Sequence, residues 1–233
     1  MTEYDKISFG DEYWQYTPEK ERKIWSEAPL KFFKGTKNKK IVEIGSGYGI
    51  FLYYFSKNNK AYGIEIDRAR VNSSIKLMKK LKRKVKVVQG DARKLPYKND
   101  FFDIVFCHGV IEHFNPSEKA IAEGYRILKK SGLAMYSVPA RISFFVPLKF
   151  LQQIADKLLG TRMWQAGYEK SFTPWKFKKM LENEGFKVIH FEISETQAGR
   201  RFPIVGKILR ILDKVFWKMQ IGGRFMYAVC KKQ

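Results

Sequence analysis

The groups best suited to chemistry lie around one glycine-rich stretch. Residues 42–49 are Val-Glu-Ile-Gly-Ser-Gly-Tyr-Gly, which places glycine at every second position from Gly45 to Gly49. Glycine permits positive φ and lets the backbone approach a ligand closely, and the N-terminus of a following helix adds a positive dipole. Any tight strand-to-helix turn also uses glycine, and Ile50 stands where the dinucleotide fingerprint has its third glycine, which disfavours NAD.

Two carboxylates follow at the ends of the next predicted strands. Glu65 lies near the end of a strand expected at 61–66, and Asp91 comes directly after one expected at 85–89. Because neighbouring strand ends in an open α/β sheet border the same crevice, Glu65 suits the two hydroxyls of a ribose and Asp91 the amino group of adenine. Glu65 could instead cap the following helix, but Asp67 fits that role better. The strand ends together predict an adenosine-type cofactor.

Short apolar strands alternate with helices between residues 40 and 138, which indicates a parallel sheet covered by helices on both faces. The expected strands are 40–44, 61–66, 85–89, 102–107, 132–138, 187–193 and 224–230. The expected helices are 50–56, 68–81, one capped by Asn115 with Pro116 in its first turn, one from Pro174 capped by Thr173 and ended by Gly185, and a basic one at 204–219.

Composition limits the class of protein. The chain has 233 residues, a net charge of +22 and two cysteines, Cys107 and Cys230, so a disulfide scaffold and a multi-cysteine zinc site are excluded. The longest stretch without Asp, Glu, Lys or Arg, residues 44–56, is shorter than the roughly 18 apolar residues of a membrane span. The N-terminus resembles no secretory signal, so we expect a cytoplasmic protein. The positive charge either favours partners that carry phosphate groups or only provides a solubilising lysine surface.

These motifs resemble the ordered motifs of class I S-adenosylmethionine-dependent methyltransferases. The matching segments are residues 43–49, 63–65, 90–92 and 102–105, followed by Val-Ile-Glu-His at 110–113 and Ile-Leu-Lys-Lys-Ser-Gly-Leu at 127–133. The last two are similar to the small-molecule, ubiquinone-biosynthesis-like branch, although Lys130 and Ser131 stand where that branch has Pro-Gly. The likeness covers residues 40–140 strongly and 168–193 moderately.

The resemblance implies a Rossmann-like, seven-stranded, mostly parallel sheet whose last strand is antiparallel, with helical lid insertions, and S-adenosylmethionine as cofactor. It also implies the site. Gly45, Gly47 and Gly49 would approach the methionine part and ribose, Glu43 would orient the amino-acid end, Glu65 would take the ribose hydroxyls, Ile66 would pack on adenine, Asp91 and Ala92 would read the adenine edge, and Cys107 and His108 would lie beneath the sulfonium.

Methyl transfer needs a general base only when the acceptor arrives protonated. Histidine titrates in the useful range, and His113 is our candidate base, although a loop histidine also commonly satisfies a local hydrogen bond. His190 falls inside a strand pattern and is interpreted as structural. Some quinone-pathway methyltransferases that this branch resembles hold a metal with Glu-x-x-Glu-His; Glu112 and His113 match, but Gly109 replaces the first carboxylate, so no metal is expected.

The organisation predicted is one domain, 1–233, with a helical lid at 1–38, a cofactor-binding core at 39–140, a lid insertion at 141–170 and the C-terminal part of the sheet at 171–233. The helix at 204–219 has a basic stripe and an apolar face. It would pack on the sheet or lie on an anionic membrane, which would add peripheral contact at the inner membrane surface. Such a lid favours a small-molecule acceptor that is lipid-like or quinone-like.

Two other functions stay open at this stage. A basic run at 76–86 makes RNA methylation an alternative, but it straddles a turn away from the expected active edge, so nucleic acid is the less favoured partner. A non-catalytic cofactor-binding scaffold is the third hypothesis. The sequence makes no prediction of the oligomeric state.

Overall fold

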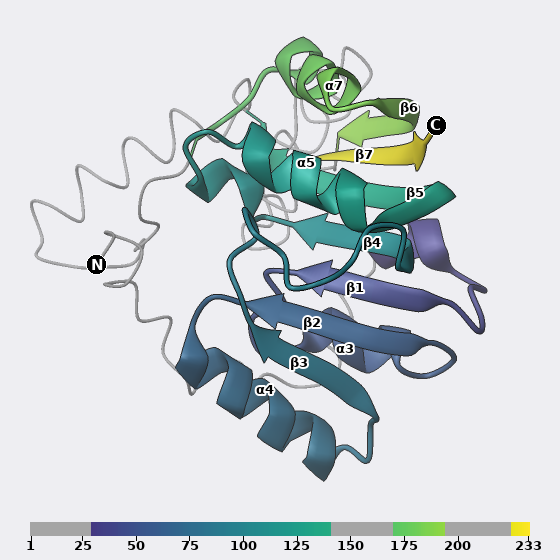
Figure 1. The fold of residues 1–233 in the computed structure, drawn as a ribbon, viewed down its shortest axis with the longest axis vertical. Coiled ribbons are helices and arrows are strands. Elements are labelled where there is room, and N and C mark those ends of the chain that lie inside the picture. The colour runs from purple at the N-terminus through teal and green to yellow at the C-terminus, as the bar shows by residue number, and fades with distance from the viewer. Residues whose placement is uncertain (1–28, 141–169, 194–224) are drawn as a thin grey trace, which may run out of the picture.

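The computed structural model describes residues 29–140, 170–193 and 225–233, and these form a single seven-stranded sheet in the order β3-β2-β1-β4-β5-β7-β6 (Figure 1). The strands are β1 (Lys40–Ile44), β2 (Lys60–Glu65), β3 (Val85–Gln89), β4 (Phe102–His108), β5 (Leu128–Pro139), β6 (Phe186–Ile193) and β7 (Phe225–Lys232). The helices are η2 (Lys31–Phe33), α3 (Ile50–Phe55), α4 (Arg68–Lys80), η3 (Ile111–His113), α5 (Glu118–Ile127) and α7 (Pro174–Asn183).

Strands β1 to β5 pair in parallel, whereas β7 is antiparallel to both of its neighbours, β5 and β6. Ile44 at the end of β1 is level with Ile64 on β2 and with Cys107 on β4. The carboxyl ends of these strands therefore meet at one edge. The predicted α/β class, the mostly parallel sheet and the antiparallel last strand are confirmed.

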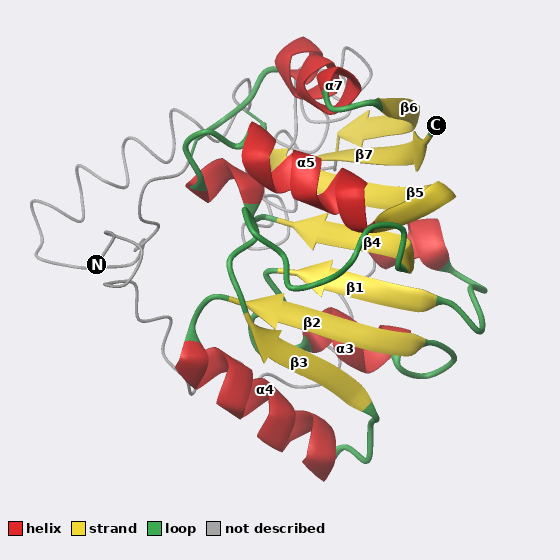
Figure 2. Ribbon diagram, in the orientation of Figure 1, coloured by secondary structure: helices red, strands yellow, loops and turns green. Residues whose placement is uncertain are grey.

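Helices cover both faces of the sheet, which separates two apolar clusters (Figure 2). The alternation is clear on β4, where Val105 and Cys107 join the cluster under α5 and α7, and Ile104 and Phe106 join the cluster under α3 and η2. Successive side chains of a strand point to opposite faces, so a strand buried on both sides is apolar almost throughout.

The described end of the N-terminal segment packs on the second face. The Phe33 ring lies 6.1 Å from the rings of Phe55 and Phe106, and the Phe32 ring lies 6.1 Å from that of Tyr227. Leu30, Phe32 and Phe33 therefore belong to the apolar cluster of this face. The lid predicted for residues 1–38 stays a prediction for 1–28, which lie outside the described residues, as do most of the lid insertion at 141–170 and the helix at 204–219.

Two predicted boundaries are wrong. The helix expected to be capped by Asn115 begins at Glu118, because the carbonyl of Ser117 accepts the N–H of Ala120 and the Ser117 hydroxyl donates to Phe114 rather than capping. Strand β5 begins at Leu128 rather than at 132, because Leu128 already pairs with Phe102 before the register shifts.

Two other local predictions hold, at Asp67 and at Gly185, whereas the capping bond expected from Thr173 is not formed. Asp67 caps α4, because its Oδ1 accepts the N–H groups of Ala69 and Arg70 at 2.7 and 3.1 Å. Pro174 starts α7 after Thr173, which makes no side-chain capping bond, and Gly185 takes φ of +91° beyond its end. Within the described segments, no helix is long and apolar enough to cross a bilayer.

Candidate active site

The glycine turn after β1 is anchored to the neighbouring strand. The N–H groups of Gly45 and Ser46 both donate to the carbonyl of Ile64, at 2.8 and 2.9 Å, and the N–H of Gly49 donates to Ser46 at 2.8 Å. These bonds hold the chain in a tight reversal between β1 and α3. Gly45, Gly47 and Gly49 have φ of +72°, +50° and +83°, a region where side chains other than glycine are strained.

The three glycines meet different surroundings. A Cβ on Gly45 would clash with the Val110 side chain, and one on Gly49 would lie 2.6 Å from the Ser74 hydroxyl. A Cβ on Gly47 would meet none of the described residues within 4 Å. Gly45 and Gly49 are therefore needed for close packing against the η3 loop and α4. Gly47 exposes bare backbone to open space, where a ligand could approach it.

Glu65 lies directly beside this open glycine. Its Oε2 accepts the N–H of Gly47 at 2.8 Å, and its Oε1 accepts the N–H of Asp67 at 3.1 Å. The side chain is buried, with 4% of its residue surface exposed. Each carboxylate oxygen has two acceptor positions, so Glu65 can order the turn and still accept hydroxyl groups from a ribose. The structure thus brings together Gly47 and Glu65, which lie 18 positions apart in the sequence.

A second carboxyl group, that of Glu43, is buried beneath the turn. Burial raises the pKa of Glu43 well above its usual range, the negative charge of Glu65 raises it further, and a backbone hydrogen bond at Leu52 opposes this. Among the described residues, the Oε2 of Glu43 has no hydrogen-bond partner. A buried acid with an unsatisfied oxygen is stabilised by a cation. The site therefore suits a positively charged ligand, and both the ammonium and the sulfonium of S-adenosylmethionine are cationic.

At the end of β4, the same edge holds two further buried groups, the thiol of Cys107 and the carboxyl group of Glu112. Burial raises the pKa of the Cys107 thiol well above its usual range, and the charges of Glu112 and Glu43 add to this. Cys107 is thus a neutral, packed thiol rather than a nucleophile. Glu112 is buried in η3, with 2% of its surface exposed. The sequence interpretation weighed it only as a metal ligand, and its place after a buried strand could have marked it as a pocket residue.

At the end of β3, Asp91 forms an ion pair with a residue that sequence reasoning missed. Arg93 contacts both carboxylate oxygens of Asp91, the shortest distance being 2.6 Å from Nη2 to Oδ2. The hydrogen bond from the Arg93 side chain outweighs burial and lowers the pKa of Asp91. The guanidinium also lies 5.0 Å from the Phe114 ring centre, joining this strand end to the loop after η3. The arginine two residues after the aspartate was the available signal.

Ala92 and Ile66 lie at the same strand ends. Ala92 is buried, with 5% of its surface exposed, and Ile66 is half-buried with its carbonyl accepting the side chain of Gln89 at 3.0 Å. Both positions are compatible with an adenine between β2 and β3. Their proposed contacts with the cofactor remain predictions.

The three histidines are separated. His108, the last residue of β4, points away from the Cys107 side, with its Nδ1 hydrogen-bonded to the Ser137 hydroxyl. His113 is half-buried at the end of η3. His190 is exposed on β6 and contacts Glu192 at 3.2 Å, far along the sheet from the glycine turn. In the part of the chain that the structure describes, no three His, Cys, Asp or Glu side chains are grouped so that they could hold a metal ion.

Comparisons with known proteins agree with this geometry. Residues 42–136 match the family described as "Methyltransferase domain". An uncharacterized protein of Methanocaldococcus jannaschii is 34% identical over 194 residues, covering 81% of this chain and 72% of that protein. The chloroplastic 2-methyl-6-phytyl-1,4-hydroquinone methyltransferase of Arabidopsis thaliana is 30% identical over 108 residues, which is 46% of this chain but 32% of that enzyme. A SAM-dependent methyltransferase of Aquifex aeolicus has a TM-score of 0.64 at 18% identity, with 93% of this chain and 94% of that chain covered.

The chain belongs to the class I S-adenosylmethionine-dependent methyltransferases. It is an enzyme that uses S-adenosylmethionine for methyl transfer. The residues present fit that cofactor, because Gly47 leaves backbone open, Glu65 is placed for hydroxyl groups and Glu43 offers a buried carboxyl oxygen to a cation.

Proposed function

We propose that this methyltransferase acts on a small aromatic acceptor of the quinol type, with lipid-like character, held beside the end of β4. The observation that carries the proposal is a cluster of rings at that point. The His108 ring stacks on Tyr227 at 5.9 Å with an interplanar angle of 6°, and it lies 5.4 Å from Phe51 and 5.1 Å from Phe225.

The position of this ring cluster supports an acceptor site. His108 ends β4, Phe225 pairs with Pro139 at the end of β5, and Phe51 lies in the first turn of the helix that follows the glycine turn. The rings therefore line the same edge as Gly47, displaced towards β5 and β7. Aromatic side chains bind planar ligands through offset or edge-to-face contacts, so this surface suits a ring.

Among the relatives, the plant hydroquinone methyltransferase supports a quinol acceptor for this chain. The chain spans about a third of that enzyme's length, so the likeness covers only part of both proteins. The acceptor contacts proposed here rest on the ring cluster rather than on that relative.

S-adenosylmethionine supplies a methyl group on a sulfonium, which is already activated for in-line displacement. The chain's own residues then have to align the acceptor and exclude water. We assign His113 as the general base that would take the proton of a hydroxyl acceptor. His108 is the second histidine at this edge, and Ser137 fixes its ring orientation through Nδ1.

The acceptor is tested by incubating the protein with labelled S-adenosylmethionine and separate pools of quinols, lipids, small amines and tRNA. Label transferred to the quinol pool by the wild type, and not by Gly47→Arg, is the expected result. Label appearing only in the amine or tRNA pool would overturn the acceptor class, and cofactor binding without label in any pool would favour the scaffold hypothesis.

The base assignment predicts that His113→Ala lowers turnover about 10²-fold or more on a hydroxyl acceptor without changing cofactor affinity. His108→Ala is the comparison, because it should chiefly raise the acceptor KM by removing one ring of the cluster. Rates measured from pH 6 to 9 distinguish the two. If His113→Ala keeps full activity across that range, His113 is not the base.

A further inference from the structure

An open groove of about 630 Å³ lies at the other end of the sheet, between the start of β1, the start of β4 and the start of β5. Five lysines line it, namely Lys34, Lys37, Lys39, Lys129 and Lys130, together with a single acid, Asp103. Both β1 and β4 begin at this groove. β1 ends at the glycine turn, and β4 ends at His108. The groove is therefore separate from the cofactor site.

The walls of the groove are irregular backbone with defined anchors. On one side, residues 34–39 include Gly35 at φ of +82° and Asn38 at +59°, and the N–H of Asn38 donates to the carbonyl of Asn58 at 2.8 Å. On the other side, the β4–β5 register passes from Phe102–Leu128 to Ile104–Leu133, so residues 129–132 bulge outward with Ser131 at φ of +59°. Two deviations from regular structure thus create the hollow.

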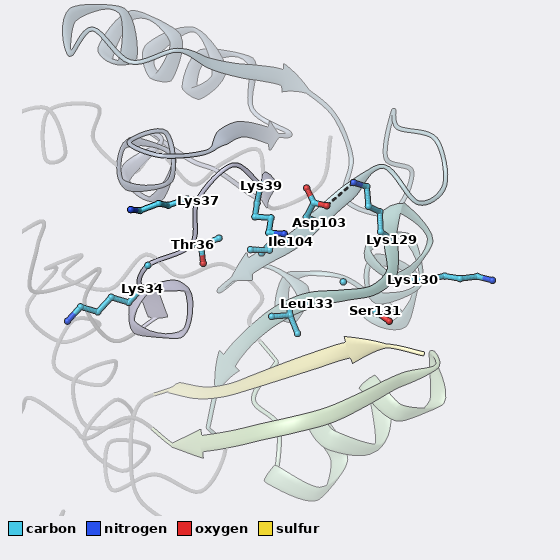
Figure 3. A pocket seen from close by; sticks show the side chains of 12 residues that line it. Lys34, Thr36, Lys37, Lys39, Asp103, Ile104, Lys129, Lys130, Ser131 and Leu133 are labelled. Carbon is cyan, nitrogen blue, oxygen red and sulfur yellow. Dashed lines mark hydrogen bonds and ion pairs between the residues drawn. The ribbon is translucent and has the colours of Figure 1, made fainter.

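Asp103, the acid of the groove, already forms an ion pair with one of the lysines. The Nζ of Lys129 contacts Asp103 Oδ1 at 2.7 Å (Figure 3). The N–H of Lys40 donates to Oδ2 at 2.8 Å. Burial raises the pKa of Asp103, but these two bonds and the charges of Lys129 and Lys39 outweigh it, so the pKa is lowered and the carboxylate stays ionised. In Figure 3, Lys34, Lys37 and Lys130 extend outward from the rim. All three are exposed.

We propose that this groove binds a small ligand that carries two or more phosphate groups. Ammonium groups on flexible four-carbon stems can converge on such a ligand as point charges, as lysines do at phosphate sites. The volume is that of a small-molecule site, and concave sites of this size hold small molecules rather than extended surfaces. A free polyanion is therefore the occupant that the geometry favours over a macromolecular surface.

The proposal is tested by calorimetric titration of the full chain with inorganic tripolyphosphate at low and at physiological salt. The groove variant carries Lys37→Glu, Lys39→Glu and Lys130→Glu. The matched control carries Lys76→Glu, Lys119→Glu and Lys176→Glu, three exposed lysines of α4, α5 and α7 with the same change in net charge. A third variant, Asp103→Asn, removes the negative charge that competes with the ligand while keeping its shape.

The groove variant should bind tripolyphosphate at least about tenfold more weakly, the control about twofold or less, and Asp103→Asn about threefold more tightly, because only local charges escape screening at physiological salt. Melting curves and S-adenosylmethionine affinity should stay near wild type in the groove and control variants. Equal losses in the groove and control variants would overturn the proposal, because the binding would then follow net charge. It would also be overturned if anionic vesicles or duplex RNA bound in a groove-dependent way while tripolyphosphate did not bind.

Discussion

The two ends of the parallel strands carry opposite charge in opposite settings. At the carboxyl end, the charged side chains that are buried are all acidic: Glu43, Glu65 and Glu112 have 3%, 4% and 2% of their surfaces exposed. At the amino end, most of the charge is exposed and basic, although Lys232 is buried there and Asp100 and Asp103 each pair with a lysine. The exposed lysines there are Lys34, Lys37, Lys39, Lys57, Lys60, Lys79, Lys80, Lys82, Lys84, Lys86, Lys98, Lys130, Lys187 and Lys231.

The two settings differ in free energy, because a buried charge loses solvation and an exposed charge does not. Exposed lysines remain solvated, so they cost the fold little and act on anions that arrive from outside. A buried carboxylate loses solvation, which destabilises the free protein unless a cation joins it. Burial and the charge of Glu65 raise the pKa of Glu43 in this way. The contrast supports our proposal that the carboxyl end binds the cationic cofactor, in spite of a net charge of +22 for the chain.

The largest effect on this contrast between the two ends is expected from a side chain added at Gly47. Gly47→Arg should weaken S-adenosylmethionine binding at least about 100-fold, because the side chain would occupy the space that the cofactor needs. Gly35→Arg is the matched control, since Gly35 also has positive φ and a Cβ position with none of the described residues within 4 Å, but lies at the amino end. Calorimetric titration measures both. Equal affinities of the two variants would contradict a cofactor site at Gly47.

The one buried lysine of the described residues tests the amino end. The Nζ of Lys232 contacts Asp100, the Tyr125 carbonyl and the Leu128 carbonyl, at 2.9, 2.8 and 2.8 Å. Lys232→Met leaves these acceptors unpaired and should cost about 1–3 kcal/mol of unfolding free energy in urea titration. Cofactor affinity should not change. Lys231→Met, at the exposed neighbouring position, should stay within about 0.5 kcal/mol of wild type.

Glu43→Gln should change stability and binding in opposite directions. Folding raises the pKa of Glu43, so the wild type loses stability as pH rises above the ordinary glutamate value of about 4.3, whereas the glutamine variant does not. At pH 7 we expect the variant to melt about 2–4 °C higher, which corresponds to roughly 1 kcal/mol. Its S-adenosylmethionine affinity should fall about tenfold, because glutamine offers no charge to a cation.

The exposed Glu182→Gln is the control for that variant and should change neither quantity. If Glu43→Gln lowers the melting temperature, the Glu43 carboxylate stabilises the free protein instead of destabilising it. The comparison of the two ends then loses its physical basis.

The smallest effect is expected at Asp91. Its pKa is lowered, chiefly by the hydrogen bond from Arg93, so the stabilisation is present above the ordinary aspartate pKa and is lost as pH falls through the lowered value. Arg93→Met should therefore cost about 0.2–1 kcal/mol at pH 7, since both side chains are about one-third exposed. The difference from wild type should vanish in acid. A constant difference down to about pH 2 would indicate lost packing on Phe114 instead.

Strands β1 to β4 were predictable from the sequence because each is a short, largely apolar run that ends in a carboxylate or is followed by glycine, as at Glu65 or at Ile44 and Gly45. Strand ends of adjacent parallel strands must meet, so Gly47 and Glu65 could be placed together without coordinates. The capping role of Asp67 followed from its position before α4.

Other features depend on contacts between distant segments. Nothing local distinguishes Gly47, which faces open space, from Gly45 and Gly49, which face Val110 and Ser74. The early start of β5 depends on pairing with β4, and the ring cluster at His108 assembles from three elements, α3, β4 and β7. The amino-end groove was missed because residues 34–39 and 129–132 meet only in the folded chain.

A crystal structure of the protein with S-adenosylmethionine tests the central claim most directly. We predict ligand density at the carboxyl ends of β1 and β2, with the ribose hydroxyls at Glu65, the backbone of Gly47 against the ligand and a cationic group near Glu43. Density at the amino ends of β1 and β4, or a Gly47 region closed by the protein's own side chains, would contradict it.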